Sequence, residues 1–144
     1  MDFQNSVLCY NGTEVIVLKL NPDCIRDILM ECEDKCAPYK NTVFKFQESF
    51  IRGENKYSWE ETIYHLQQCE MNGFFSRLSH DFAGAYRVID ITPKAHEFLE
   101  NIRNDNVWIK TKDMASKVGS FSLDVLKSCA SAVISGIIKS RFGI

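Results

Sequence analysis

The spacing of apolar residues changes twice between positions 57 and 103, and these changes predict a helix, a two-stranded ribbon and a second helix. Apolar side chains recur at helical spacing over 58–72, where Ser58 and Glu61 form a capping box and Gly73 follows as the C′ residue. Over 74–91 the period falls to two, which is typical of paired strands. Thr92 and Pro93 then begin a helix that we expect to end at Arg103.

The helix over 58–72 is amphipathic, so its pattern also predicts which side chains reach solvent. Trp59, Ile63 and Leu66 form the apolar stripe that we expect to be buried. At 100° per residue the opposite face carries a set of polar and aromatic side chains. This predicted exposed face consists of Glu61, Tyr64, His65, Gln68 and Asn72.

Shorter patterns predict the elements before this region. The β-branched run at 13–20 indicates a strand that can add to the edge of the ribbon's sheet. Asn21 and Pro22 then begin a helix with a buried stripe formed by Ile25, Ile28, Leu29 and Cys32. Alternation over 42–47 predicts the first strand of the sheet.

Two further helices are predicted after position 103, over 107–118 and 122–140. The last one carries a small residue at every fourth position, which lets another helix approach closely. Docking of this helix on the chain's own core is the favoured interpretation, and a dimer seam is the alternative. The small residues are Ser128, Ala132, Gly136 and Ser140.

A helix followed by a β ribbon and a closing helix resembles a winged helix. The fold class is therefore predicted to be α+β, a winged-helix-like domain with a small antiparallel sheet and extra C-terminal helices. We expect an N-terminal extension over 1–20, a winged-helix-like core over 21–103, and a helical extension over 104–144 that packs on the core or forms a dimer seam.

Several motifs relate the chain to one particular family. The chain contains the segments His96-Glu97-Phe98-Leu99-Glu100-Asn101-Ile102-Arg103 and Gly119-Ser120-Phe121-Ser122-Leu123, with Trp108 and Thr111-Lys112 spaced between them. These motifs are similar to those of an uncharacterised phage and prophage family, domain of unknown function 2513. The opening Asn21-Pro22-Asp23-Cys24 resembles the usual start of that family. The resemblance covers about position 20 to the C-terminus and implies a phage or prophage origin and a winged-helix-like fold, with no established activity.

Composition and charge limit the partners and the compartment. The 144 residues carry a net charge of −2, so no global basic field draws the protein to nucleic acid or to an anionic membrane. The last part, 104–144, has six bases and three acids and is basic, whereas 58–103 has four bases and seven acids. Six cysteines without a C-x-x-C motif, and no targeting peptide, predict a reducing bacterial cytoplasm.

The sequence offers little reaction chemistry, and we expect no enzyme and no cofactor. His65 and Cys69 lie one helical turn apart, but no third group orients them and Cys69 turns toward the core. Cys32 and Cys36 can place two thiolates on one helix face, but zinc needs two more ligands and none stands at finger spacing.

Two classes of function remain, and the favoured one is a DNA-binding regulator. In helix-turn-helix relatives the second helix reads base edges in the major groove, a role that falls here to Tyr64, His65 and Gln68. The ribbon residues Arg77, His80 and Arg87 are expected to reach phosphate or the minor groove. Because the helix over 58–72 has three glutamates and no Lys or Arg, its phosphate contacts must come from the ribbon or from Lys110, Lys112 and Lys117.

The alternative is a protein-binding inhibitor or adaptor that acts on a host bacterial machine, such as one used in defence. Its acidic, tyrosine-bearing helix face would dock on a basic partner surface. Both interpretations use the same residues, and a homodimer through the C-terminal helix is compatible with either.

Overall fold

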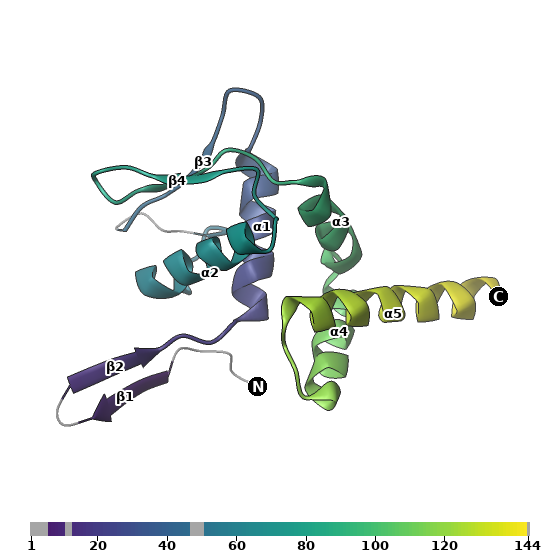
Figure 1. The fold of residues 1–144 in the computed structure, drawn as a ribbon. Coiled ribbons are helices and arrows are strands. Elements are labelled where there is room, and N and C mark those ends of the chain that lie inside the picture. Colours follow the sequence, from purple (N-terminus) through teal and green to yellow (C-terminus); the bar gives the residue numbers. More distant parts are fainter. Residues whose placement is uncertain (1–5, 11–12, 47–50, 144) are drawn as a thin grey trace. The chain divides into compact units, whose positions relative to one another are not determined.

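The computed structural model describes residues 6–10, 13–46 and 51–143 (Figure 1). Its elements are β1 (Ser6–Tyr10), β2 (Thr13–Val17), α1 (Pro22–Lys35), β3 (Thr42–Phe44), α2 (Trp59–Met71), β4 (Leu78–His80), β5 (Tyr86–Val88), α3 (Pro93–Ile102), α4 (Asp105–Val118) and α5 (Leu123–Phe142). The fold class is α+β, with a small three-stranded antiparallel sheet, as predicted. No helix within the described ranges has the length and apolar character needed to cross a bilayer.

The chain divides into two compact units, residues 1–95 and 96–144. The division falls inside α3, one turn after its start, whereas we predicted it after Arg103 at the end of the same helix. Each unit is described separately below.

The N-terminal residues form a hairpin of their own. β1 and β2 pair antiparallel, with Ser6 opposite Val17 and Tyr10 opposite Thr13. The prediction of a strand at the start of this region is confirmed, but the prediction that it joins the edge of the ribbon's sheet is wrong. The preceding residues supplied a partner strand, which the pattern over positions 1–11 did not reveal.

Helix α1 begins and buries its stripe as the sequence predicts. The Asn21 side chain accepts hydrogen bonds from the backbone N–H groups of Asp23 and Cys24, and Pro22 occupies the first turn, where no N–H is needed. Ile25, Ile28, Leu29 and Cys32 are almost fully buried. Each large aliphatic side chain in this stripe contributes about 1.5–3 kcal/mol by leaving water, and α2 packs against the helix.

The three-stranded sheet, which we call the wing sheet, has the order β3-β5-β4. Val88 lies opposite both Thr42 of β3 and Leu78 of β4, so β5 is the central strand. Thr42, Phe44 and Val88 are buried on one face. Successive residues alternate between faces, so Val43, Arg87 and Ser79 lie side by side on the other.

The prediction of paired strands between positions 74 and 91 is confirmed, with Phe75 and Ile91 forming a further bridge at the base of the ribbon. Two apolar positions differ from the alternation we expected. Phe46 is exposed because β3 ends at Phe44, and Ile89 is exposed because β5 ends at Val88.

The second unit contains most of α3 followed by α4 and α5. Asn104 caps α4 through the N–H groups of Asn106 and Val107, so this helix begins two residues earlier than predicted. Figure 1 shows α4 crossing α5, whose C-terminal half continues past the crossing. Trp108, Thr111 and Ala115 of α4 are buried as expected, but Val118 in the last turn is exposed.

Candidate functional site

Helix α2 is held at both ends by hydrogen bonds that the sequence predicts. The Ser58 hydroxyl accepts from the Glu61 N–H at 3.1 Å. At the other end the Phe74 N–H donates to the Cys69 carbonyl and the Gly73 N–H to the Glu70 carbonyl, with Gly73 at a φ of +75°. This paired arrangement is a Schellman motif, which glycine favours because it adopts positive φ without strain.

A buried polar cluster joins α2 to the start of α1. The His65 ring is fully buried. Its Nε2 accepts a hydrogen bond from the Asn21 backbone N–H, and its Nδ1 lies 2.7 Å from the Glu61 carbonyl oxygen. Nε2 must be unprotonated to accept, so the ring is neutral with its proton on Nδ1. The Asn21 side-chain amide donates to the Glu61 carboxylate at 3.0 Å.

These contacts contradict the predicted exposure of two residues. Glu61 and His65 are buried, so the prediction that they form part of a contact face is wrong. The buried side of α2 is rotated toward Thr62 and His65, because Asn21 supplies polar partners that make burial of the imidazole and the carboxylate tolerable. Trp59 and Ile63, which we expected in the core with Leu66, are half-buried.

The same cluster bears on the histidine–cysteine pair considered above. Both ring nitrogens of His65 are engaged with backbone groups. Cys69 is fully buried, and burial raises the pKa of its thiol. This pair is therefore not arranged as a base and an activated nucleophile.

The outward side of α2 is acidic and partly apolar. Tyr64 and Gln68 are half-buried, and the half-buried Asn72 caps the helix by donating its side-chain amide to the Gln68 carbonyl at 2.8 Å. The exposed residues of α2 are ones that the helical wheel did not single out: Glu60, Gln67, Glu70 and Met71. Their positions follow from the rotation of the helix, which only the Asn21 contacts reveal.

Glu70 connects α2 to the ribbon. Its carboxylate accepts a hydrogen bond from the Leu78 backbone N–H at 3.1 Å, at the start of β4. The aromatic rings of Trp59, Tyr86 and His80 form a second connection, with centroid separations of 6.1 Å and 5.3 Å along the series. The helix and the ribbon are thus tied together at two places.

The wing sheet carries cations on the face that points away from its core. We call this surface the outer wing face and define it by Val43, Arg77, Ser79 and Arg87. Arg77 lies on the same side as Ser79 by alternation, and it is exposed. Arg87 is half-buried and contacts the Asp81 carboxylate at 3.5 Å. His80 lies on the opposite face, where it stacks on Tyr86.

Asp81 has a structural role in the ribbon loop. Its carboxylate accepts a hydrogen bond from the Ala85 N–H at 3.1 Å, and this bond is the main reason that the pKa of Asp81 is lowered. On the outer wing face, Arg87 therefore contacts a carboxylate that is already bound to the backbone.

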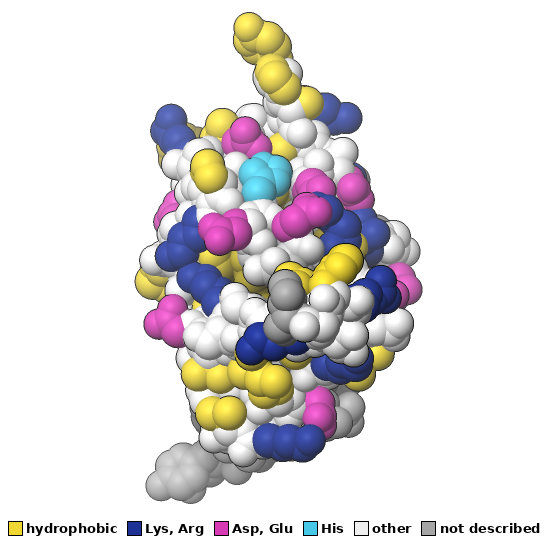
Figure 2. Space-filling view, turned by 90° about the vertical axis from the view of Figure 1, so that its right-hand side faces the viewer, with side chains coloured by type: hydrophobic (Ala, Val, Ile, Leu, Met, Phe, Trp, Pro, Cys, Tyr) yellow, Lys and Arg dark blue, Asp and Glu magenta, His cyan; other side chains and the backbone are white. Residues whose placement is uncertain are grey.

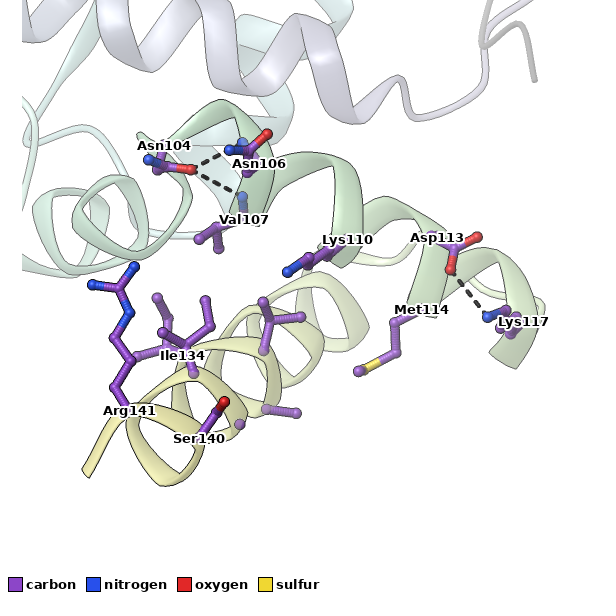
Figure 3. Close-up of a pocket in the computed structure, with 14 residues that line it drawn as sticks. Asn104, Asn106, Val107, Lys110, Asp113, Met114, Lys117, Ile134, Ser140 and Arg141 are labelled. Carbon is purple, nitrogen blue, oxygen red and sulfur yellow. Dashed lines mark hydrogen bonds and ion pairs between the residues drawn. The ribbon is translucent and has the colours of Figure 1, made fainter. Parts of the chain in front are cut away.

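The three predicted lysines of the C-terminal part belong to the second unit. The Lys112 ammonium lies 5.5 Å from the centre of the Trp108 ring. Lys110 and Lys117 lie along a groove between α4 and α5, with a volume of about 900 Å³ (Figure 3). Val133, Ile134 and Ile137 supply apolar lining, and Lys117 forms an ion pair with Asp113.

The small residues of α5 are exposed along their whole stripe, from Ser128 to Ser140. A Cβ atom added at Gly136 would meet nothing within 4 Å. Packing within the described chain therefore does not require glycine at this position, and the dimer seam stays a prediction.

Comparison with known proteins gives one family. The family model described as "Hypothetical protein (DUF2513)" matches residues 19–122. The chain belongs to the DUF2513 family. An uncharacterised protein of Haemophilus influenzae is 27% identical over 124 residues, which cover 84% of this chain and 99% of that protein. No solved structure matches the chain.

The DUF2513 match includes α1, α2, the wing sheet, α3 and α4. It ends at Ser122, the N-cap of α5, whereas the resemblance seen in the sequence ran to the C-terminus. The acidic side of α2 and the outer wing face thus both lie within the part of the chain that the family model describes. In the described ranges of this DUF2513 chain, no three His, Cys, Asp or Glu side chains gather in a metal-binding arrangement.

Proposed function

We propose that this DUF2513 protein is a non-enzymatic, winged-helix-like DNA-binding protein whose outer wing face makes the main contact with phosphate. The observation that carries the proposal is the placement of Arg77 and Arg87 on one face of the wing sheet. The element order α1-β3-α2-β4-β5 and the strand order β3-β5-β4 support the winged-helix interpretation.

The charge on α2 argues for contact through the ribbon. Its outward side presents Glu60 and Glu70 and has no Lys or Arg between Trp59 and Met71. Phosphates would repel these carboxylates, and phosphate contacts supply much of the affinity of proteins for DNA. The major groove is about 12 Å wide and admits a two-stranded ribbon as well as a helix, so β4 and β5 can take the leading role.

Charge elsewhere does not provide a broad basic field. Unit 1, residues 1–95, contains fourteen acids and ten bases. On the face shown in Figure 2, lysine and arginine side chains are interspersed with acidic ones. Binding should therefore depend on a few cations and be weak, with a slope of log affinity against log salt of about −2 to −3 for two or three phosphate contacts.

The test is fluorescence anisotropy of a labelled random-sequence duplex at two salt concentrations. Arg77→Ala should weaken binding and make the salt slope shallower by about one. Lys139→Ala, which removes an exposed cation on α5, is the matched control and should leave both quantities unchanged. Equal effects of the two substitutions would reject the outer wing face as the contact surface.

A second candidate is a protein-binding adaptor or inhibitor, favoured by the exposed Met71 beside the acidic residues of α2. An exposed methionine among carboxylates suits a partner surface that is basic with an apolar centre. Absence of DNA binding at low salt would favour this candidate. The phage setting, the cytoplasmic location and the homodimer stay predictions.

A further inference from the structure

Two cysteines lie one helical turn apart at the end of α1. Cys32 is fully buried in the last turn, and Cys36 is the half-buried C-cap residue. The Cys36 N–H donates to the Cys32 carbonyl at 2.7 Å, so the helical turn is closed between them. A rise of about 1.5 Å per residue places their Cα atoms roughly 6 Å apart, and disulfides span about 4.4–6.8 Å. Cβ atoms four residues apart on a helix are about 5–6 Å apart, whereas a disulfide needs about 3.5–4.5 Å, so the bond requires a shift of Cys36, which leaves the helix in an extended conformation.

The Cys36 sulfur has partners that hold it as a thiolate. Cys32 donates a hydrogen bond to it, and the Thr42 hydroxyl lies 3.1 Å away. The bond from Cys32 is the largest of the effects that lower the pKa of Cys36 to about 6. In the protonated state its S–H can donate to the Val88 carbonyl at 3.7 Å.

Other buried thiols in the first unit have raised pKa values, unlike Cys36. Burial is the main reason that the pKa values of Cys24 and Cys69 are raised. Cys32 is itself held as a thiol, mainly by its hydrogen bond to Cys36. The pair therefore combines a half-buried sulfur whose pKa is lowered with a fully buried sulfur whose pKa is raised, which are the features of an attacking and a resolving cysteine.

We propose that Cys36 and Cys32 are an oxidation site that forms a reversible intramolecular disulfide on reaction with a peroxide. The Cys36 sulfur attacks one peroxide oxygen. The S–O bond forms, the O–O bond breaks, and the leaving oxygen takes a proton to become water. The Cys32 sulfur then attacks the Cys36 sulfenic acid, and the S–O bond breaks as the S–S bond forms. The hydroxyl group leaves as water with the Cys32 proton, so two thiols and one hydrogen peroxide give one disulfide and two waters.

The site lies where α1 meets the wing sheet. Thr42 belongs to β3 and Val88 to β5, and both contact the Cys36 sulfur. Disulfide formation shortens the distance from that sulfur to Cys32 and removes its S–H, which weakens these contacts, so amide exchange at the start of β3 should become faster in the oxidised protein. This inference does not depend on the proposed DNA binding.

The test treats the full chain with hydrogen peroxide, blocks the remaining thiols with N-ethylmaleimide, and locates the products by peptide mass spectrometry. In the wild type the peptides that contain Cys32 and Cys36 should be linked to each other, with a combined mass about 2 Da below that of their two thiol forms, and dithiothreitol should separate them. Cys32→Ser should stop at a Cys36 sulfenic acid that dimedone traps. Cys129→Ser, which changes a buried thiol in the other unit, is the matched control and should oxidise like the wild type.

Alkylation of the untreated wild type gives an independent measurement that needs no variant to fold. Cys36 should react about ten times faster than Cys129, because the reactive form is the thiolate. A disulfide between any other two of the six cysteines, oxidation of Cys32 in Cys36→Ser, or equal alkylation of Cys36 and Cys129 would overturn the proposal.

Discussion

Replacement of His65 by alanine should strongly destabilise the first unit, because the ring bridges α1 and α2. His65→Ala removes the acceptor of the Asn21 N–H, and Asn21 is itself buried. An unsatisfied buried donor costs about 1–3 kcal/mol. Loss of the buried ring adds about 1–2 kcal/mol for the cavity. The free energy of unfolding should therefore fall by about 2–5 kcal/mol, a large part of the 5–15 kcal/mol typical of domains.

Urea denaturation followed by circular dichroism measures this loss. His96→Ala, an exposed histidine on α3, is the matched control and should change the free energy of unfolding by less than about 0.5 kcal/mol. His65→Gln should recover part of the loss, since its side-chain oxygen can accept from the Asn21 N–H. If His65→Ala and His96→Ala are equally stable, the bridge has no energetic role.

The same histidine predicts a dependence of stability on pH. Burial lowers the pKa of His65 in the folded protein. The unfolded chain therefore takes up a proton on this histidine near pH 6.5, whereas the folded protein does not. The histidine's contribution to the free energy of unfolding is complete above pH 6.5 and is lost as the pH falls below it. The loss cannot exceed about 1.4 kcal/mol per pH unit, which is the limit for a single proton. An equal pH slope in His65→Gln would refute this assignment.

Two further substitutions test the ends of the ribbon. Glu70→Ala should speed amide exchange at Leu78 by removing an exposed hydrogen bond worth about 0.5–1.5 kcal/mol, whereas Gln67→Ala on the same helix should not. Gly73→Ala should cost about 1–2 kcal/mol in urea denaturation, because φ is +75° and the added Cβ meets only the Lys94 side chain at 3.9 Å. Gly136→Ala, in an open helical position, should instead stabilise by about 0.4–1 kcal/mol, and equal losses at both glycines would contradict the role of positive φ.

Local signals predicted the elements well. Asn21, Ser58 and Gly73 mark helix ends through hydrogen bonds within a few residues, and the structure contains those bonds. The change of period after Gly73 likewise predicted paired strands. Such features depend on neighbouring residues, so a single sequence contains the information.

The contact face of α2 could not be predicted in the same way. The helical wheel placed Trp59 and Ile63 at the centre of the buried side, but the packed helix buries His65 and Glu61. Their partner is Asn21, about forty positions earlier in the chain. A polar residue is buried when a distant residue satisfies its hydrogen bonds, and no local pattern reports that partner.

The same limit applies to Glu70 and to the N-terminal hairpin. The Glu70 carboxylate accepts from the Leu78 N–H, and this partner lies outside the helix whose pattern places Glu70. The hairpin was mistaken for an added edge strand because β2 is strand-like in isolation and its partner β1 has no distinctive pattern. Strand partners are set by tertiary pairing, whereas strand propensity is local.

The most direct test of the proposed function is an NMR titration of the labelled protein with a random-sequence duplex at low salt. We predict that the largest shifts occur at Val43, Ser79 and Arg87 on the outer wing face and disappear as salt is raised. Shifts concentrated at Gln67 and Met71 of α2, or no shifts at low salt, would contradict the account.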